Sequence, residues 1–286
     1  MIIRNALGSG AKSLKKIAGG WSIAAGEAEI LLGLTLGKKL EEIYMRLDEN
    51  LSASDYRRFR SYLSRRLKHE PIAYICGYKY FFDSKFIVKK RVTLIPRPET
   101  EVLIERANAL IHANTTIIDV GTGSGAIAIS LARSHPHLSI VATDISAAAL
   151  NIAQKNAQKN GVKKNISFQK TSLLPKRFPK KIERLLIVAN LPYIRTTDWK
   201  RLPLHIKKFE PRSALDGGKN GLDIYRALFT KLWEHRQQQA FTLLAEIDPE
   251  QAIRFAKEIK KYWPKATIKT EKDLSGNIRV MEVIQQ

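Results

Sequence analysis

The sequence predicts an α/β protein in which a small helical domain precedes a doubly wound, Rossmann-like domain with a parallel sheet. From Glu99 onward, apolar runs of strand length alternate with longer segments of helical periodicity. Such alternation is typical of a parallel sheet with helices on both faces, which binds ligands at the carboxyl ends of its strands. Residues 1–70 show apolar positions at helical spacing only. We therefore expect a helical domain at 1–70, a β-hairpin linker at 71–98 and the doubly wound domain at 99–286.

Local patterns predict the individual elements. The segment from Ser52 to Asp55 offers an N-cap for a helix over 56–67, one of four or five helices expected in the first domain. Short β-type runs at 72–75, 78–82 and 86–88 predict the hairpin, which would link the two domains. In the second domain we expect strands at 116–120, 139–143, 166–169, 185–189, 241–246, 267–271 and 278–283, and helices at 102–111, 126–132, 147–158, 225–236 and 250–262.

Composition excludes several classes of protein. The chain has 286 residues, 44% of them apolar, and its one cysteine is Cys76. A single cysteine excludes a disulfide framework and fits a reducing compartment, so we expect a cytoplasmic protein, and we expect a monomer. No apolar stretch approaches the roughly 20 residues that span a bilayer, so we expect no membrane partner. The histidines are scattered without metal-ligand spacing, and we expect no bound metal.

The formal net charge of +22 allows two interpretations. Between Lys155 and Arg184 there are ten Lys or Arg residues and one acid, Glu183. Such a segment could be an electrostatic footprint for nucleic acid or the ribosome. It could equally be a set of lysines on solvated helix faces and loops. Because aromatic residues are not interleaved with the lysines, we favour the second interpretation and expect at most weak, non-specific contact with RNA.

A glycine-rich loop follows the first predicted strand of the sheet. Residues 116–132 read TIIDVGTGSGAIAISLA, a buried strand, a tight turn and the start of a helix. Glycines let a ligand approach the backbone, and the helix N-terminus offers unpaired N–H groups. An acid at the end of the next strand is placed to bind ribose hydroxyls. This pattern fits a nicotinamide cofactor or S-adenosylmethionine, and an acid just before the glycines favours the latter. The candidate cofactor-binding residues are Asp119, Gly121, Thr122, Gly123, Ser124, Gly125 and Asp144.

A second motif ends the strand at 185–189. It reads Asn190-Leu191-Pro192-Tyr193, and all four residues are our catalytic candidates. The asparagine side-chain oxygen and the next backbone carbonyl can accept hydrogen bonds from a planar NH2 group. The proline biases the residue before it towards an extended backbone, and the tyrosine offers a face for a planar amide or base. Alone, these residues also fit an ordinary exit from a strand into a loop.

Several motifs in order resemble one family. They are IPRPETE at 95–101, DVGTGSG at 119–125, NLPYI at 190–194, FEPRSALDGGKNGLDIYRAL at 209–228 and DLSGNIRV at 273–280. Together they are similar to the peptide chain release factor glutamine methyltransferase family, known as HemK or PrmC. The resemblance runs almost from end to end, and the first and fourth motifs are more specific than the glycine loop.

The resemblance implies methyl transfer from S-adenosylmethionine to a glutamine side-chain amide in the Gly-Gly-Gln loop of class I release factors. It also implies that the helical domain recognises this protein substrate. The family's glycine loop falls on residues 121–125 and its ribose-binding acid on Asp144. Its Asn-Pro-Pro-Tyr motif falls on residues 190–193, where Asn190 also lies near the cofactor. The amide clamp would then consist of Asn190 Oδ1 and the Leu191 carbonyl.

The chain departs from the family pattern at three positions. Leu191 replaces the first proline of the Asn-Pro-Pro-Tyr motif, a mild change if only the carbonyl is used. Ser172 lies where the family usually has an acid that addresses adenine, and we keep it as a candidate cofactor contact. Asp248 stands where the family tends to have glycine.

Two further segments allow more than one interpretation. Arg97, Glu99 and Thr100 either lie near the active cleft or simply stiffen the domain junction and begin a helix. The segment around Glu210, Arg212 and Asp216 is interpreted as a structural, ion-paired loop.

Two other functions remain open at this point. A ribosomal RNA adenine dimethyltransferase commonly carries Asn-Leu-Pro-Tyr, but its glycine loop usually follows Glu-Ile-Gly, and it would not explain IPRPETE. A non-catalytic protein that binds release factors or the ribosome would bind the cofactor without turnover.

Overall fold

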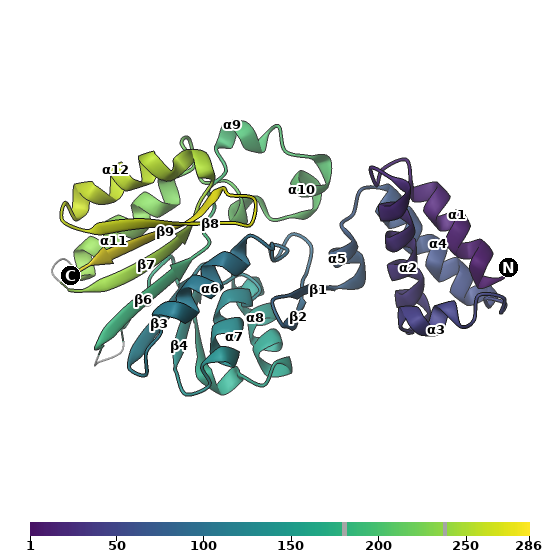
Figure 1. Ribbon diagram of the computed structural model, residues 1–286, viewed down its shortest axis with the longest axis horizontal. Coiled ribbons are helices and arrows are strands. Elements are labelled where there is room, and N and C mark those ends of the chain that lie inside the picture. The colour runs from purple at the N-terminus through teal and green to yellow at the C-terminus, as the bar shows by residue number, and fades with distance from the viewer. Residues whose placement is uncertain (179–181, 237–238) are drawn as a thin grey trace. The chain divides into compact units, whose positions relative to one another are not determined.

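A seven-stranded sheet forms the centre of the larger of two units in this computed structural model, which describes residues 1–178, 182–236 and 239–286 (Figure 1). The units are Met1–Gly77 and Tyr78–Gln286. Among the described residues, no helix combines the length and the apolar character needed to cross a bilayer.

The first unit, all of whose residues are described, is helical as predicted. Ser52 caps its fourth helix by accepting a hydrogen bond from the Asp55 backbone N–H at 3.0 Å. Phe59 from this helix and Leu14 and Leu31 from two others are buried in a common core. The helices are α1 (Ile3–Leu14), α2 (Trp21–Leu36), α3 (Leu40–Tyr44), α4 (Ala53–Leu67) and α5 (Ile72–Cys76).

The strand expected at 72–75 is wrong, because this segment forms α5. Pro71 stands at its N-cap, and Tyr74 and Ile75 are buried. A short apolar run cannot be assigned to helix or strand by periodicity alone, and here burial among other helices decides. The helical unit therefore extends to Gly77 instead of ending at residue 70.

The predicted hairpin is present and belongs to the second unit. Strands β1 (Tyr78–Phe81) and β2 (Ser84–Ile87) pair antiparallel. Phe81 and Phe86 are buried in the core on one face of the large sheet.

The large sheet has the order β5-β4-β3-β6-β7-β9-β8. Its first five strands in this order are parallel, as predicted. Of the seven strands, β9 alone runs in the opposite direction, because it inserts antiparallel between β7 and β8 after a tight turn, and β8 runs in the same direction as the first five. The strands are β3 (Thr115–Val120), β4 (Ile140–Asp144), β5 (Ile166–Lys170), β6 (Arg184–Ala189), β7 (Phe241–Glu246), β8 (Thr267–Lys272) and β9 (Ile278–Gln285).

Helices cover both faces of this sheet, which confirms the doubly wound fold (Figure 1). Helices α6 (Thr100–Leu110) and α7 (Ala126–Ser134) pack on one face, and α11 (Asp223–Arg236) and α12 (Ala252–Tyr262) on the other. The remaining helices are α8 (Ala147–Lys159), α9 (Thr196–Trp199) and α10 (Leu204–Phe209), with short 3-10 turns at Lys163–Asn165, Arg212–Ala214 and Pro249–Gln251.

The strand order reverses between β3 and β6. From β3 the chain continues to β4 and β5 on one side, and then returns to β6 and β7 on the other. In open α/β sheets, the loops at the carboxyl ends of strands beside such a reversal form the ligand crevice. Both motifs found in the sequence follow these two strands.

Candidate active site

The glycine loop and the Asn-Leu-Pro-Tyr motif meet at the carboxyl ends of β3 and β6. The register pairs Val120 with Ala189, so the residues that follow them start side by side. A Cβ added to Gly121 would lie 2.9 Å from Leu191 Cδ2, and the φ angle of this glycine is +74°. Both the close contact and the positive φ angle favour glycine here. The two motifs therefore form one site.

The glycine loop, residues 121–125, is tied to the neighbouring strand β4. The N–H groups of its first two residues donate to the Thr143 carbonyl at 2.9 Å, and the third donates to Asp144 Oδ2 at 2.9 Å. Ser124 is buried, and the loop ends at the N-terminus of α7. The structure thus brings the predicted loop residues and Asp144 together at the N-terminus of a helix.

Asp119, the acid before the glycines, is fully buried, and one of its oxygens has no partner in the described part of the chain. Oδ2 accepts hydrogen bonds from Thr122 Oγ1 at 2.6 Å and from the Ala128 N–H at 3.2 Å. Among the described residues, no donor reaches Oδ1. Burial raises the pKa of Asp119 to about 7. A buried carboxylate oxygen without a donor calls for a cation, and the amino group of S-adenosylmethionine supplies one.

Asp144 also fits the cofactor. Its Oδ1 accepts from the Ser146 N–H at 2.8 Å, and burial raises its pKa. Carboxylate oxygens have spare lone pairs, so both can accept ribose hydroxyls while holding these N–H groups. Ser172 is exposed just beyond β5, where Thr171 donates its N–H to the Asp144 carbonyl at 3.1 Å. Ser172 is therefore close to Asp144 along the edge of the sheet.

The side-chain amide of Asn190 is held in one orientation. Its Nδ2 donates to Glu246 Oε2 at 2.8 Å and to Thr100 Oγ1 at 3.0 Å. The Thr100 hydroxyl donates in turn to the same carboxylate oxygen at 2.6 Å. Both amide hydrogens are thus used, and Asn190 Oδ1 has no donor among the described residues. The Leu191 carbonyl also accepts no hydrogen bond there. Both predicted acceptors thus have no donor among the described residues, although Leu191 itself is buried and does not line the pocket described below.

Asn190 and Glu246 line a pocket of about 180 Å³. Tyr193 contributes its ring and donates its hydroxyl to Glu246 Oε1 at 3.3 Å. Burial and the neighbouring Glu246 charge raise the pKa of Tyr193, so its hydroxyl stays protonated. The remaining walls are mainly aliphatic. The lining residues are Leu94, Arg97, Asn190, Tyr193, Ile194, Ile206, Ala214, Leu215 and Glu246.

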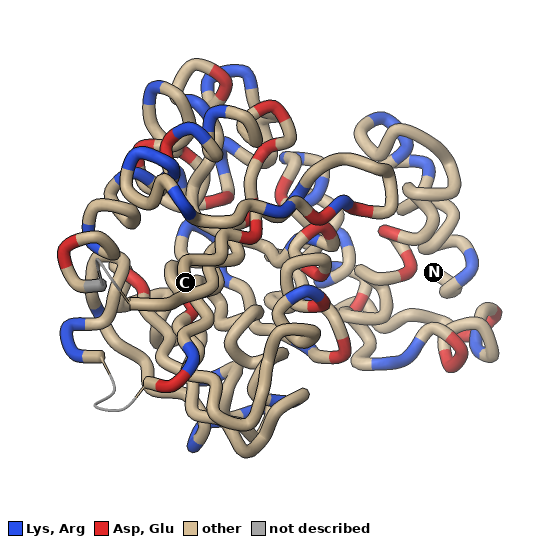
Figure 2. The backbone as a smooth tube through the Cα atoms, turned by 60° about the vertical axis from the view of Figure 1, so that its left-hand side comes forward, with Lys and Arg blue, Asp and Glu red and all other residues tan. Residues whose placement is uncertain are grey.

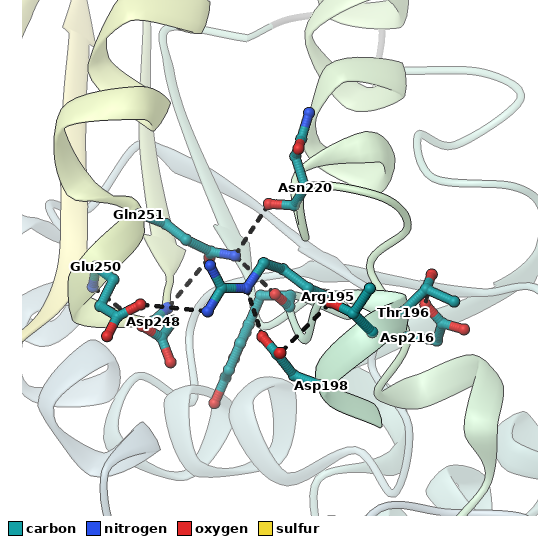
Figure 3. Close-up of polar contacts among 10 residues, drawn as sticks. Arg195, Thr196, Asp198, Asp216, Asn220, Asp248, Glu250 and Gln251 are labelled. Atoms are coloured by element: carbon teal, nitrogen blue, oxygen red, sulfur yellow. Dashed lines mark hydrogen bonds and ion pairs between the residues drawn. The ribbon is translucent and has the colours of Figure 1, made fainter. Parts of the chain in front are cut away.

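The backbone after the motif is clamped from two sides. Gln251 donates its side-chain N–H to the Tyr193 carbonyl at 2.7 Å, and in Figure 3 this amide also points to the Asn220 carbonyl. Gly221 leaves no room for a side chain, because a Cβ there would lie 2.2 Å from the same tyrosine carbonyl. Asp248, which stands where the family tends to have glycine, caps the turn that carries Gln251.

The two segments left open by the sequence both have structural contacts. Arg97 pairs with the buried Glu210 while lining the pocket. Asp216 pairs with Arg212 at 2.8 Å and accepts from the Thr196 hydroxyl at 2.7 Å, as Figure 3 shows for the latter contact. The EPRSALDGG segment therefore carries the ion pairs that we expected and also lines the pocket through Ala214 and Leu215, and the IPRPETE segment both begins α6 and reaches the pocket through Arg97.

Three residues of this site were not predicted from the sequence. Glu246 and Gln251 contact the motif directly, and the buried Tyr225 hydroxyl donates to the Ala189 carbonyl at 3.1 Å and the Glu246 carbonyl at 2.6 Å. The sequence does contain one indication of Glu246, because this acid ends the otherwise largely apolar strand FTLLAE, which pairs with β6.

Comparisons with known proteins identify the family. Residues 5–77 match the PrmC N-terminal domain, and residues 111–181 match a methyltransferase domain. The release factor glutamine methyltransferase of Moorella thermoacetica is 40% identical over 230 residues, which cover 80% of this chain and 79% of that protein. The chain belongs to the release factor glutamine methyltransferase family. A member from Dictyoglomus turgidum is 35% identical over 90% of each chain.

A solved structure supports the fold alone. The hMettl16 catalytic domain, in complex with MAT2A 3'UTR hairpin 1, has a TM-score of 0.52 and 17% identity, and the match covers 84% of this chain and 83% of that one. Together these findings confirm the predicted family, fold class, methyltransferase activity and S-adenosylmethionine as cofactor. The roles of individual residues stay predictions.

Proposed function

We propose that this protein methylates the side-chain amide nitrogen of the glutamine in the Gly-Gly-Gln motif of class I release factors. The observation that supports this substrate is the fixed amide of Asn190, with its oxygen left open beside the glycine loop. A primary amide presents two N–H donors, and Asn190 Oδ1 and the Leu191 carbonyl are two acceptors. The names of the relatives point to the same substrate.

The chemistry requires positioning more than proton transfer. An amide nitrogen is a weak nucleophile, because its lone pair is delocalised into the carbonyl. When bound, S-adenosylmethionine supplies an electrophilic methyl group. Asn190 and Leu191 aim the nitrogen, Tyr193 supports the amide plane, and both acceptor oxygens stabilise the positive charge that grows on nitrogen. The proton can leave after transfer.

The cofactor would be held by residues of the glycine loop and its neighbours. Asp119 Oδ1 would bind the amino group, since it is a buried acceptor without a donor among the described residues. Asp144 would bind the ribose hydroxyls, and Ser172 lies near enough along the sheet edge to serve the adenine side.

For the partners, we propose that the helical unit recognises the release factor and that the protein acts as a cytoplasmic monomer. Nucleic acid is not required. Figure 2 shows Lys and Arg on many separate segments, with Asp and Glu interspersed, and this distribution supports solvated surfaces more than an RNA-binding face. At most, the charge would give weak, salt-sensitive RNA contact.

The proposal is tested by offering both substrate classes together. The protein is incubated with radiolabelled S-adenosylmethionine, a class I release factor and ribosomal RNA. We expect label only in the release factor, as one methyl on the Gly-Gly-Gln glutamine in a peptide mass spectrum. A release factor whose motif carries Gly-Gly-Glu is the matched control and should stay unlabelled. Dimethyladenine in the RNA would favour the adenine dimethyltransferase instead, and cofactor binding without turnover would favour a non-catalytic binding protein.

A further inference from the structure

Glu246 is a buried acid that the clamp mechanism leaves without a role. It ends β7, is 1% exposed, and lines the pocket together with Asn190 and Tyr193. The residues before it, Leu243, Leu244 and Ala245, are all buried and apolar. An ionisable group at such a place is costly unless its contacts compensate for lost hydration.

The contacts of Glu246 converge on the asparagine. One carboxylate oxygen receives N–H from Asn190 at 2.8 Å and O–H from Thr100 at 2.6 Å, and the other receives O–H from Tyr193 at 3.3 Å. An ionised carboxylate only accepts hydrogen bonds. If the Asn190 amide turned over, its oxygen would face an acceptor, so only one of the two amide orientations is satisfied.

We propose that Glu246 is a positioning residue for methyl transfer, which locks Asn190 with Oδ1 towards the acceptor glutamine and supplies negative charge behind it. This assignment rests on the proposed function. The lock acts on the bound substrate and on the transition state alike. The charge acts mainly on the transition state, because positive charge grows on the glutamine nitrogen only then.

The surroundings set the pH range in which this charge exists. The pKa of Glu246 is raised to about 6, because burial and the charge of Glu99 raise it by more than the hydrogen bonds from Thr100 and Tyr193 and the charge of Arg279 lower it. The Tyr225 hydroxyl donates to the backbone carbonyl of Glu246, and Arg97 is the remaining charged residue of the pocket lining. The carboxyl is therefore ionised at neutral pH and takes up a proton just below it.

Replacement by glutamine separates the lock from the charge. In Glu246→Gln, the side-chain oxygen can still accept from Asn190 and Thr100, and the new NH2 can face the Tyr193 hydroxyl. We expect KM for the release factor to change less than about threefold, while kcat falls at least about tenfold, as for a lost transition-state contact. Glu246→Leu removes both lock and charge, and should raise KM as well.

The pH profile gives a readout that a purely structural role would not move. At saturating S-adenosylmethionine, kcat of the parent should fall about tenfold per pH unit below about pH 6, as the carboxylate is lost. Glu246→Gln should lack this limb. Glu282→Gln is the matched control, because Glu282 is a buried acid on the adjacent strand that pairs with Arg106 at 2.6 Å, away from the motif. It should lose stability but keep kcat and the limb.

The outcomes separate this assignment from the proposed function. A parent protein that does not methylate the release factor would overturn the proposed function and this assignment with it. An active parent whose Glu246→Gln variant keeps kcat and the acidic limb would overturn this assignment alone. If that variant does not fold, Thr100→Val serves instead, because it removes the second hydrogen bond to the Asn190 amide. This variant should lower kcat several-fold, and an unchanged kcat would contradict the locking of Asn190.

Discussion

Asp119→Asn should weaken the binding of S-adenosylmethionine and at the same time stabilise the empty protein. Asparagine can keep the two hydrogen bonds that Thr122 and Ala128 donate to Oδ2, and it replaces only the oxygen that has no donor among the described residues. A hydrogen bond between charged groups contributes about 1.5–3 kcal/mol, so the dissociation constant should rise on the order of 10- to 100-fold.

The pH dependence of binding follows from the raised pKa of Asp119. Because that pKa is about 7 in the empty protein, the carboxyl must lose a proton to pair with the cofactor's ammonium group. Affinity of the parent should therefore fall as pH drops below about 7, whereas affinity of Asp119→Asn should not. Calorimetric titrations at about pH 8 and pH 6 measure both effects. Asp198→Asn, at a half-buried position outside the glycine loop, is the control.

Stability should change in the opposite direction. The folded pKa of Asp119 lies above its value in the unfolded chain, so its ionisation costs stability progressively as pH rises from about 4 to about 7. The rise of this pKa from 3.8 to about 7 corresponds to about 4 kcal/mol. The unpaired amide of the variant costs about 2 kcal/mol at any pH and offsets part of this gain. Denaturant unfolding should show Asp119→Asn about 2 kcal/mol more stable than the parent at pH 8, and about 2 kcal/mol less stable at pH 4, where only the cost of the unpaired amide remains. Unchanged cofactor affinity at pH 8, with an unchanged pH dependence, would refute the reasoning.

Two further predictions concern the loop. Leu191→Pro removes a long hydrogen bond, at 3.4 Å, from the Leu191 N–H to Tyr225 Oη and replaces the buried leucine side chain, but it leaves the carbonyl in place. Release-factor turnover should therefore be kept or raised, and a loss of more than about tenfold would show that the leucine side chain is needed. Gly221→Ala should cost more than about 3 kcal/mol in denaturant unfolding, because its Cβ would overlap the Tyr193 carbonyl. Gly276 has a similar φ angle, but a Cβ added there would meet no atom within 4 Å, so Gly276→Ala should cost only about 1–2 kcal/mol. Equal losses of stability in the two variants would contradict the clamping of the loop at Gly221.

The meeting of the two motifs could be predicted from the sequence, since each follows an apolar strand and the carboxyl ends of parallel strands share one edge. The lock on Asn190 could not, because it depends on three separate facts. These are the start of α6 at Thr100, the pairing of β6 with β7, and the end of β7 at Glu246. Only the folded register brings these side chains within hydrogen-bonding distance.

Two elements of the fold were missed for different reasons. Ile72–Cys76 is apolar and short, so burial among helices, which local sequence does not encode, decided its structure. The antiparallel insertion of β9 follows from the tight turn at Asp273–Asn277, where Asp273 accepts from two backbone N–H groups at 2.9 Å. The position of the pair in the sheet depends on long-range pairing with β7.

The most direct test of the account is the single-turnover rate of Asn190→Ala on a class I release factor, with peptide mass spectrometry of the Gly-Gly-Gln glutamine as the readout. The account predicts a loss of about 3 kcal/mol of transition-state stabilisation, about a hundredfold in rate, as for one preorganised contact. The affinity for S-adenosylmethionine should change much less, because the acceptor amide is the main partner of Asn190 Oδ1. If Asn190→Ala methylates the glutamine as fast as the parent, Asn190 is not the amide clamp and the proposed mechanism is wrong.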